Sequence, residues 1–147
     1  MRKTLQLAVA FPWALVASCS QPRVAGVLTL APAGMIVSAG CVAEEDGTLR
    51  MPSQGSATAT AYAPAGTLVA AIVGRALGPD PVELEVYFDG RPVARFSFTS
   101  AEGEVRREFQ VPVDRDGPHT WRIAVAGMAP SPDVALFHFH KLVLRIA

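Results

Sequence analysis

Two histidines near the C-terminus have the side chains and the spacing best suited to binding a ligand. His138 and His140 are two residues apart in an apolar, strand-like segment, so both side chains leave the same face. Imidazole nitrogens are common metal ligands, and Asp133 is close in the sequence. Zinc needs a third or fourth ligand, however, and His119 is the only other histidine. We therefore expect Asp133, His138 and His140 to contact a ligand or partner without a metal, and we keep metal binding as the alternative.

A run of three acids is the other group whose side chains could do chemistry. Glu44, Glu45 and Asp46 are adjacent, but neighbouring residues on a strand point to opposite faces, and such a run is typical of a solvated turn. The sequence also has no Gly-x-Ser-x-Gly nucleophile elbow, phosphate-binding loop or His-Glu-x-x-His motif. We predict that the protein is not an enzyme, with no catalytic residues and no cofactor.

Aromatic residues near these histidines have two possible roles. Trp121 could stack on a sugar, but it alternates with Ile123 and Val125, which predicts a place in the core. Phe137 and Phe139 share the strand face opposite the histidines, so one of the two pairs faces outward. If the phenylalanines face outward, they form an apolar contact patch.

The N-terminus has the pattern of a bacterial lipoprotein signal. A basic start is followed by an apolar stretch over residues 5–17, and small residues precede Cys19. The stretch is too short for a membrane-spanning helix, so the pattern indicates an export signal. We expect residues 1–18 to be the cleaved signal peptide, Cys19 to be lipidated, and residues 19–23 to form a short tether.

These features predict an exported protein that a lipid holds at the periplasmic face of a bacterial membrane. Each acyl methylene in a bilayer contributes about 0.8 kcal/mol, so several chains on Cys19 make a permanent anchor. Ser20 follows the cysteine, which resembles the sorting pattern of enterobacterial outer-membrane lipoproteins and favours the outer membrane or cell surface. Cys41 then has no partner for an internal disulfide. We expect it to be a buried, inert thiol, with an intermolecular disulfide or a reactive group as alternatives.

Composition restricts the remaining classes. Lys plus Arg and Asp plus Glu number 13 each, so no net positive charge is available to attract nucleic acid. The 12 Gly and 12 Pro residues separate short apolar runs, which is typical of an all-β chain. Residues 24–43 are uncharged and could be mistaken for a membrane span, but Pro32 and the glycines favour two short strands joined by a turn.

Residues 82–98 contain the clearest strand signal. Apolar and polar residues alternate, and the central Asp89-Gly90 is typical of the type I′ turn of a β-hairpin. Other strand-like segments occupy residues 57–62, 67–75, 105–113, 120–125 and 134–146. Eight to ten short strands result, and an antiparallel two-sheet β-sandwich over residues 24–147 buries them most economically.

Several short motifs also follow one another in a characteristic order between residues 28 and 144. They include Val-Tyr-Phe-Asp-Gly and Gly-Pro-His, and together they occupy residues 30–40, 45–49, 53–55, 64–66, 86–90, 117–119 and 133–137. In this order they resemble the jelly-roll carbohydrate-binding modules of the galactose-binding-like superfamily, especially the calcium-dependent xylan-binding type. The resemblance implies a jelly-roll sandwich that binds a glycan, with acidic calcium ligands in the first strand and before the last one.

The calcium ligands of that family are not matched. Residues 31–34 are Ala-Pro-Ala-Gly and residues 127–132 are Gly-Met-Ala-Pro-Ser-Pro, so only Asp133 is present among the expected acids. Calcium takes six to eight oxygen ligands, and we therefore expect that none is bound.

Two functions remain. We predict a non-catalytic, lipid-anchored envelope protein whose sandwich binds a glycan. The alternative is an accessory structural lipoprotein of a larger membrane or envelope complex, which the short tether favours because a freely sampling glycan binder needs a longer linker. An apolar outer face on residues 82–98 or on the last strand would indicate a protein partner, and a groove with an outward aromatic residue flanked by Asn, Asp or Arg would indicate a sugar.

Overall fold

The computed structural model describes residues 21–127 and 134–147. The signal segment 1–18, Cys19 and Asp133 lie outside the described residues. Within these residues the chain forms eleven strands and two 3-10 helices, η1 (Pro32–Gly34) and η2 (Ser100–Glu102). The strands are β1 (Val27–Leu30), β2 (Ile36–Val37), β3 (Val42–Ala43), β4 (Leu49–Pro52), β5 (Ser56–Ala63), β6 (Gly66–Ala76), β7 (Val82–Phe88), β8 (Arg91–Phe98), β9 (Val105–Val113), β10 (Gly117–Val125) and β11 (Ala135–Ile146). The number exceeds the eight to ten expected because β2 and β3 have only two residues each.

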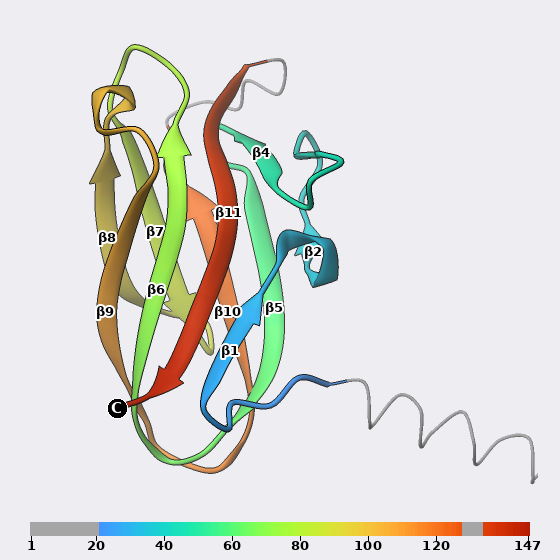
Figure 1. Cartoon of the computed structure of the whole chain (residues 1–147), viewed down its shortest axis with the longest axis vertical. Coiled ribbons are helices and arrows are strands. Elements are labelled where there is room, and N and C mark those ends of the chain that lie inside the picture. The colour runs from blue at the N-terminus through green and yellow to red at the C-terminus, as the bar shows by residue number, and fades with distance from the viewer. Residues whose placement is uncertain (1–20, 128–133) are drawn as a thin grey trace, which may run out of the picture.

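The strands form two antiparallel sheets packed face to face (Figure 1). One sheet has five strands in the order β2-β5-β10-β7-β8. The other sheet has six strands in the order β3-β4-β11-β6-β9, with β1 as the sixth. One edge of β11 pairs with β4 along its first half and with β1 along its second half. This arrangement confirms the predicted all-β, two-sheet jelly roll.

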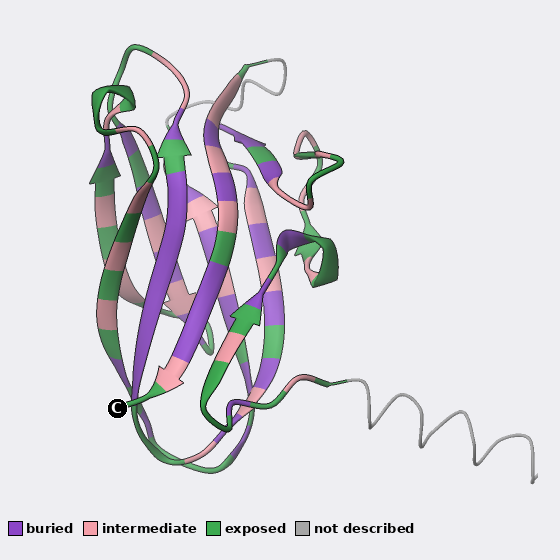
Figure 2. Cartoon of the chain, in the orientation of Figure 1, coloured by how far each residue is buried: buried purple, intermediate pink, exposed green. Residues whose placement is uncertain are grey.

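The core fills the space between the sheets because each strand directs alternate residues inward. Its largest side chains include Trp121, Phe88, Phe137 and Phe139, all essentially inaccessible to solvent. Trp121 therefore lies in the core as predicted, and the phenylalanines of the last strand form no exposed patch. β6 is buried over most of its length on both faces, also as predicted (Figure 2).

The β7–β8 hairpin has the turn that the sequence predicts, although its register shifts by one residue between Val86 and Tyr87. Asp89 and Gly90 have φ angles of 51° and 82°, the positive values that a type I′ turn requires at both central residues. Val82, Leu84 and Val86 point into the core, so the polar residues between them lie on the outer surface.

The last strand contains a β-bulge that periodicity did not reveal. β11 pairs Phe139 and Lys141 with consecutive residues of β6, which leaves His140 as the extra residue. Phe139 points into the core before the bulge, and Leu142 and Leu144 do so after it. The inward positions therefore shift by one residue after the bulge. This shift explains why the apolar residues of the segment fall on both faces when the sequence is read with an uninterrupted two-residue period.

The chain joins the sandwich before residue 24, where the domain was expected to begin. The carbonyl oxygen of Pro22 accepts a hydrogen bond from the Tyr62 N–H, and the Val24 N–H donates to the Tyr62 carbonyl, both at 2.8 Å. Arg23 lies over the Tyr62 ring, 4.2 Å from its centroid. Residues 22 and 23 of the expected tether are thus fastened to β5. No helix in the described ranges is long and apolar enough to cross a membrane.

Cys41 was expected to be a buried thiol, but it is only half-buried. Its Sγ lies 3.7 Å from Ser38 Oγ and 3.9 Å from the carbonyl oxygen of Ser56, and the side chain packs against the edge of the core. It is a free cysteine within the part of the chain that the structure describes.

Candidate functional site

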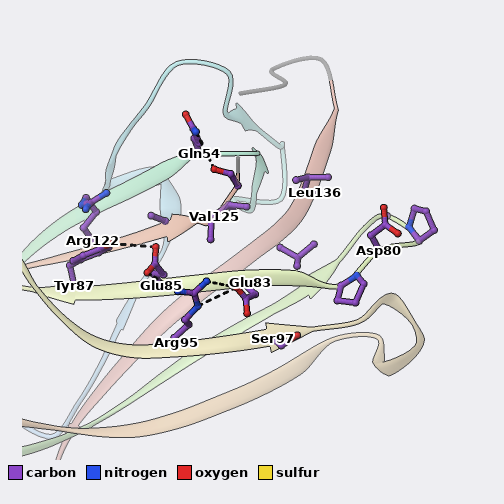
Figure 3. Close-up of a pocket in the computed structure, with 17 residues that line it drawn as sticks. Gln54, Asp80, Glu83, Glu85, Tyr87, Arg95, Ser97, Arg122, Val125 and Leu136 are labelled. Atoms are coloured by element: carbon purple, nitrogen blue, oxygen red, sulfur yellow. Dashed lines mark hydrogen bonds and ion pairs between the residues drawn. The ribbon is translucent and has the colours of Figure 1, made fainter. Parts of the chain in front are cut away.

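A groove runs along the outer face of the five-stranded sheet. Strand alternation places Glu83, Glu85 and Tyr87 of β7 on this face, beside Arg95 of β8 and Arg122 of β10. Together with neighbouring residues they line a cavity of about 880 Å³ (Figure 3). A cavity of this volume is in the range of ligand-binding clefts in proteins.

Loops line one end of the groove. Residues 78–81, Gly-Pro-Asp-Pro, belong to the connection between β6 and β7, and the two prolines restrict the backbone of this connection. Gln54 lines the groove from the β4–β5 turn, and its Nε2 donates a hydrogen bond to the carbonyl oxygen of Gly127 at 3.1 Å. The groove is therefore bounded here by segments whose backbone is restrained.

Three charged residues form a network on the groove surface. Arg95 Nε donates to Glu83 Oε2 at 3.2 Å, and Arg95 Nη1 lies 3.5 Å from Glu85 Oε2. A further Arg95 nitrogen, Nη2, also pairs with Glu83. Hydrogen bonding to Glu83 raises the pKa of Arg95, so its guanidinium remains charged at all ordinary pH values. The network offers donors and acceptors side by side.

An aromatic ring lies next to this network. The Arg122 guanidinium carbon is 4.1 Å from the centroid of the Tyr87 ring, a cation–π contact between paired residues of β10 and β7. The Tyr87 hydroxyl donates to Glu85 Oε1 at 3.4 Å. Figure 3 shows the ring and the guanidinium together at one side of the groove. This pair combines a flat, partly apolar surface with hydrogen-bond donors.

Sequence reasoning missed this groove as a site, although part of its signal was present. The alternation in residues 82–98 already placed Glu83, Glu85 and Tyr87 outward. The contribution of Arg122 depends on β10 lying next to β7, and this order of strands cannot be read from local pattern. In the groove, an outward aromatic residue, Tyr87, lies beside arginines. This is the pattern expected from the sequence for a sugar ligand rather than a protein partner.

The predicted site residues on β11 lie on the other sheet. His138 and His140 share its outer face, both half-buried, and their ring centroids are 4.6 Å apart. Thr48 Oγ1 is 2.6 Å from His138 Nε2, and Glu104 contacts His140 Nδ1. Burial first, and then the neighbouring His140, lower the pKa of His138. Asp133, expected to join them, lies outside the described residues.

In residues 21–127 and 134–147, no three His, Cys, Asp or Glu side chains lie close enough together to hold a metal ion. These residues therefore offer no metal site with three or more protein ligands. The hollow beside η1, where the resemblance implies calcium ligands, has Glu44 as its only carboxylate. Glu44 Oε1 pairs with Arg50 Nε at 2.5 Å. Calcium needs six to eight oxygen ligands, and this hollow of the described chain does not fit that requirement.

His119 is the histidine whose burial the sequence did not indicate. It is 1% exposed, its Nδ1 contacts Asp89 Oδ2 at 2.6 Å, and its Nε2 contacts the carbonyl oxygen of Arg115 at 2.9 Å. Burial tends to raise the pKa of Asp89. Hydrogen bonds from His119 and from the Thr120 N–H outweigh burial and hold this pKa below its ordinary value. His119 therefore ties the β7–β8 turn to β10 as a structural residue.

Comparisons with known proteins find similarity only at the level of three-dimensional structure. No protein family profile and no curated protein matches the sequence. A family 35 carbohydrate-binding module from Clostridium thermocellum superposes with a TM-score of 0.66 at 10% identity, over 82% of this chain and 98% of that one. The C-terminal family 6 module of a marine laminarinase from Zobellia galactanivorans also gives 0.66, at 8% identity, over 82% of this chain and 99% of that one.

A third similar structure is a family 35 module from Paenibacillus barcinonensis, with a TM-score of 0.58 and 16% identity. The likeness covers 82% of this chain and 98% of that module. In all three cases nearly the whole of the module is matched. The protein therefore has the jelly-roll fold of carbohydrate-binding modules, as its motif order predicted.

Proposed function

We propose that the protein is a non-catalytic, lipid-anchored envelope protein that binds a glycan in the groove of the five-stranded sheet. The observation that carries the proposal is the pairing of Tyr87 and Arg122 beside the Arg95–glutamate network in a cavity of about 880 Å³. The shared fold with carbohydrate-binding modules supports it.

The groove has the chemistry that a sugar requires. A sugar ring has an apolar C–H face that packs on an aromatic or guanidinium plane, and a rim of hydroxyl groups that both donate and accept hydrogen bonds. Tyr87 and Arg122 supply the plane, and Arg95, Glu83 and Glu85 supply donors and acceptors. Because Arg95 is already held by two carboxylates, little side-chain entropy is lost when it binds a hydroxyl group.

Binding in this groove would not depend on calcium. Its carboxylates, Glu83 and Glu85, are both engaged by Arg95, and a guanidinium between them repels a divalent cation. The chain also has no carboxylate at residues 31–34. We therefore propose a calcium-independent glycan-binding module.

A second candidate is the accessory structural subunit that contacts protein. Val27, Ile36 and Val42, on the short strands β1 to β3, are 69%, 80% and 56% exposed. These aliphatic residues belong to the part of the domain that follows the expected anchor, where a neighbouring subunit of a membrane complex would lie.

Affinity electrophoresis on a panel of plant and bacterial polysaccharides tests the proposal. We expect at least one polysaccharide to retard the protein equally with calcium and with EDTA, and Tyr87→Ala and Arg122→Ala to weaken that binding about tenfold each. Arg106→Ala, which changes an exposed residue of β9 on the other sheet, is the matched control and should bind normally. Failure of the whole panel would favour the accessory-subunit function. Undiminished binding by both groove variants would place the glycan outside the groove and overturn the proposed site.

A further inference from the structure

Two histidine nitrogens face each other on the outer face of the six-stranded sheet. The groove lies on the other sheet. His138 and His140, called the histidine pair below, lie on β11 on either side of the inward-pointing Phe139. Their rings meet edge to face at 73°, and His138 Nδ1 is 3.3 Å from His140 Nε2. Whether these two nitrogens share a hydrogen bond or can bind a cation depends on which ring nitrogens carry protons.

Hydrogen bonding assigns the proton of His138. Thr48 Oγ1 lies 2.6 Å from Asp46 Oδ1 and 2.6 Å from His138 Nε2. A carboxylate only accepts, so the Thr48 hydroxyl donates its single proton to Asp46. Thr48 must then accept from His138, which places the ring proton on Nε2 and leaves a lone pair on Nδ1 of the neutral ring.

Glu104 assigns the proton of the other ring. Its Oε1 contacts His140 Nδ1, and because the carboxylate accepts, His140 Nδ1 donates. The proton of the neutral ring is therefore on Nδ1, and Nε2 has the lone pair. When both rings are neutral, two lone pairs face each other across 3.3 Å, and a cation between them, either a proton or a metal ion, stabilises this arrangement.

The spacing of the two nitrogens fits a metal ion. Zinc–nitrogen bonds of about 2.0–2.1 Å at a tetrahedral angle separate two ligand nitrogens by about 3.4 Å. We propose that the histidine pair binds a divalent transition metal ion of the zinc class through His138 Nδ1 and His140 Nε2. The remaining coordination positions are open to water or to another ligand. The described chain supplies these two nitrogens and no third protein ligand, so water or another ligand would complete the three or four that zinc takes.

The groups behind the histidine pair are those that support metal ligands in proteins. A ligating histidine typically donates its other N–H to a carboxylate or an equivalent acceptor, which fixes the ring and makes the ligating nitrogen more basic. Glu104 does this for His140, and Thr48 with Asp46 does it for His138. The bulge also takes part, because it displaces His140 from the regular ladder, as bulges next to functional sites do.

The charges around the pair favour a cation. Asp46, Glu44 and Arg50 act on His138, and Glu104 acts on His140. Three carboxylates therefore lie near the pair. The guanidinium groups beside His138 are those of Arg50, which is held by Glu44 at 2.5 Å, and of Arg75, which pairs with His138 across β6. The carboxylates outnumber these two guanidinium groups, which favours a divalent cation at the two nitrogens.

Isothermal titration of the full-length protein with zinc chloride, after removal of any affinity tag, tests the proposal. We expect one zinc ion per chain, with the affinity reduced at least tenfold in His138→Ala and in His140→Ala. Glu104→Gln keeps both ligands and removes only the carboxylate, and we expect it to weaken zinc binding about tenfold. Glu108→Gln, on the outer face of β9 in the same sheet, is the matched control and should bind zinc like the wild type.

Each variant is first shown to be folded by circular dichroism and thermal unfolding in EDTA. A wild-type protein that gives no zinc binding would overturn the proposal and would mean that the histidine pair shares only a proton. Zinc binding that persists in the double variant His138→Ala, His140→Ala would place the metal on other residues and would overturn it equally. Both outcomes are independent of the groove, because the pair lies on the other sheet.

Discussion

Gly74 is the position where a single added methyl group tests the packing of β6 against β11. A Cβ at this residue would lie 2.5 Å from Phe137 Cζ and 2.6 Å from the carbonyl oxygen of His138. Ordinary contact begins at 3.4 Å, so both neighbours would have to move by about 1 Å. Phe137 is fully buried and packs edge-on against Phe98, with ring centroids 4.8 Å apart, and the carbonyl belongs to the backbone of β11. Neither neighbour has free space to move into.

We expect Gly74→Ala to lower the free energy of unfolding by about 2 kcal/mol. Overpacking a core costs about 1–3 kcal/mol, and a clash with backbone belongs at the upper end of that range. The loss of backbone freedom in the unfolded chain offsets about 0.4–1 kcal/mol of this. For a domain of this size the change corresponds to a fall in Tm of about 8 °C.

Thermal and urea unfolding followed by circular dichroism measure the effect. Gly26→Ala is the matched control, because a Cβ there meets nothing within 4 Å, and its stability should stay within about 0.5 kcal/mol of the wild type. A Gly74→Ala protein as stable as the wild type would refute the reasoning, since it would show that β6 and β11 separate around the added methyl group at no cost.

Two further predictions concern the turn and the anchor. The pKa of Asp89 is lower in the folded chain than its ordinary value of 3.8, so its carboxylate stabilises the fold above that pH and loses this contribution as the pH falls. The stability difference between wild type and Asp89→Asn in urea unfolding should therefore narrow below about pH 4, and an equal difference at pH 7 and pH 3 would contradict this. Cys19→Ala should move the protein from the membrane to the soluble fraction of cells, and continued sedimentation with membranes would exclude lipidation at Cys19 as the anchor.

Local patterns predicted those parts of the fold that neighbouring residues determine. The β7–β8 hairpin was predictable because Asp89-Gly90 accepts positive φ and residues 82–88 before it alternate strictly. The core position of Trp121 was predictable for the same reason, since its neighbours at 123 and 125 are also apolar. In each case the information lies within about ten residues of the chain.

Features that depend on the partner strand were not predictable. The bulge at His140 interrupts the two-residue period, so no single assignment of faces fits the whole of β11. The groove requires Arg122 to lie beside Tyr87, which are 35 residues apart and meet only because β10 pairs with β7. The sequence places His119 next to a turn, but its buried position is tolerated because its ring contacts the distant Asp89 as well as the carbonyl oxygen of Arg115.

The length of β6 determines how far the groove loop 78–81 lies from the end of the sandwich where the described chain begins. Both ends of the described chain lie at one end of the sandwich, where Val24 bonds to Tyr62 and Ala147 to Thr67 (Figure 1). β6 starts at that end and, eleven residues later, leads into the loop 78–81 that lines the groove. Eleven extended residues span about 36 Å. If Cys19 is lipidated as we propose, few residues separate the lipid from Pro22, so the sandwich itself would be the spacer and would hold the loop end of the groove several nanometres above the bilayer.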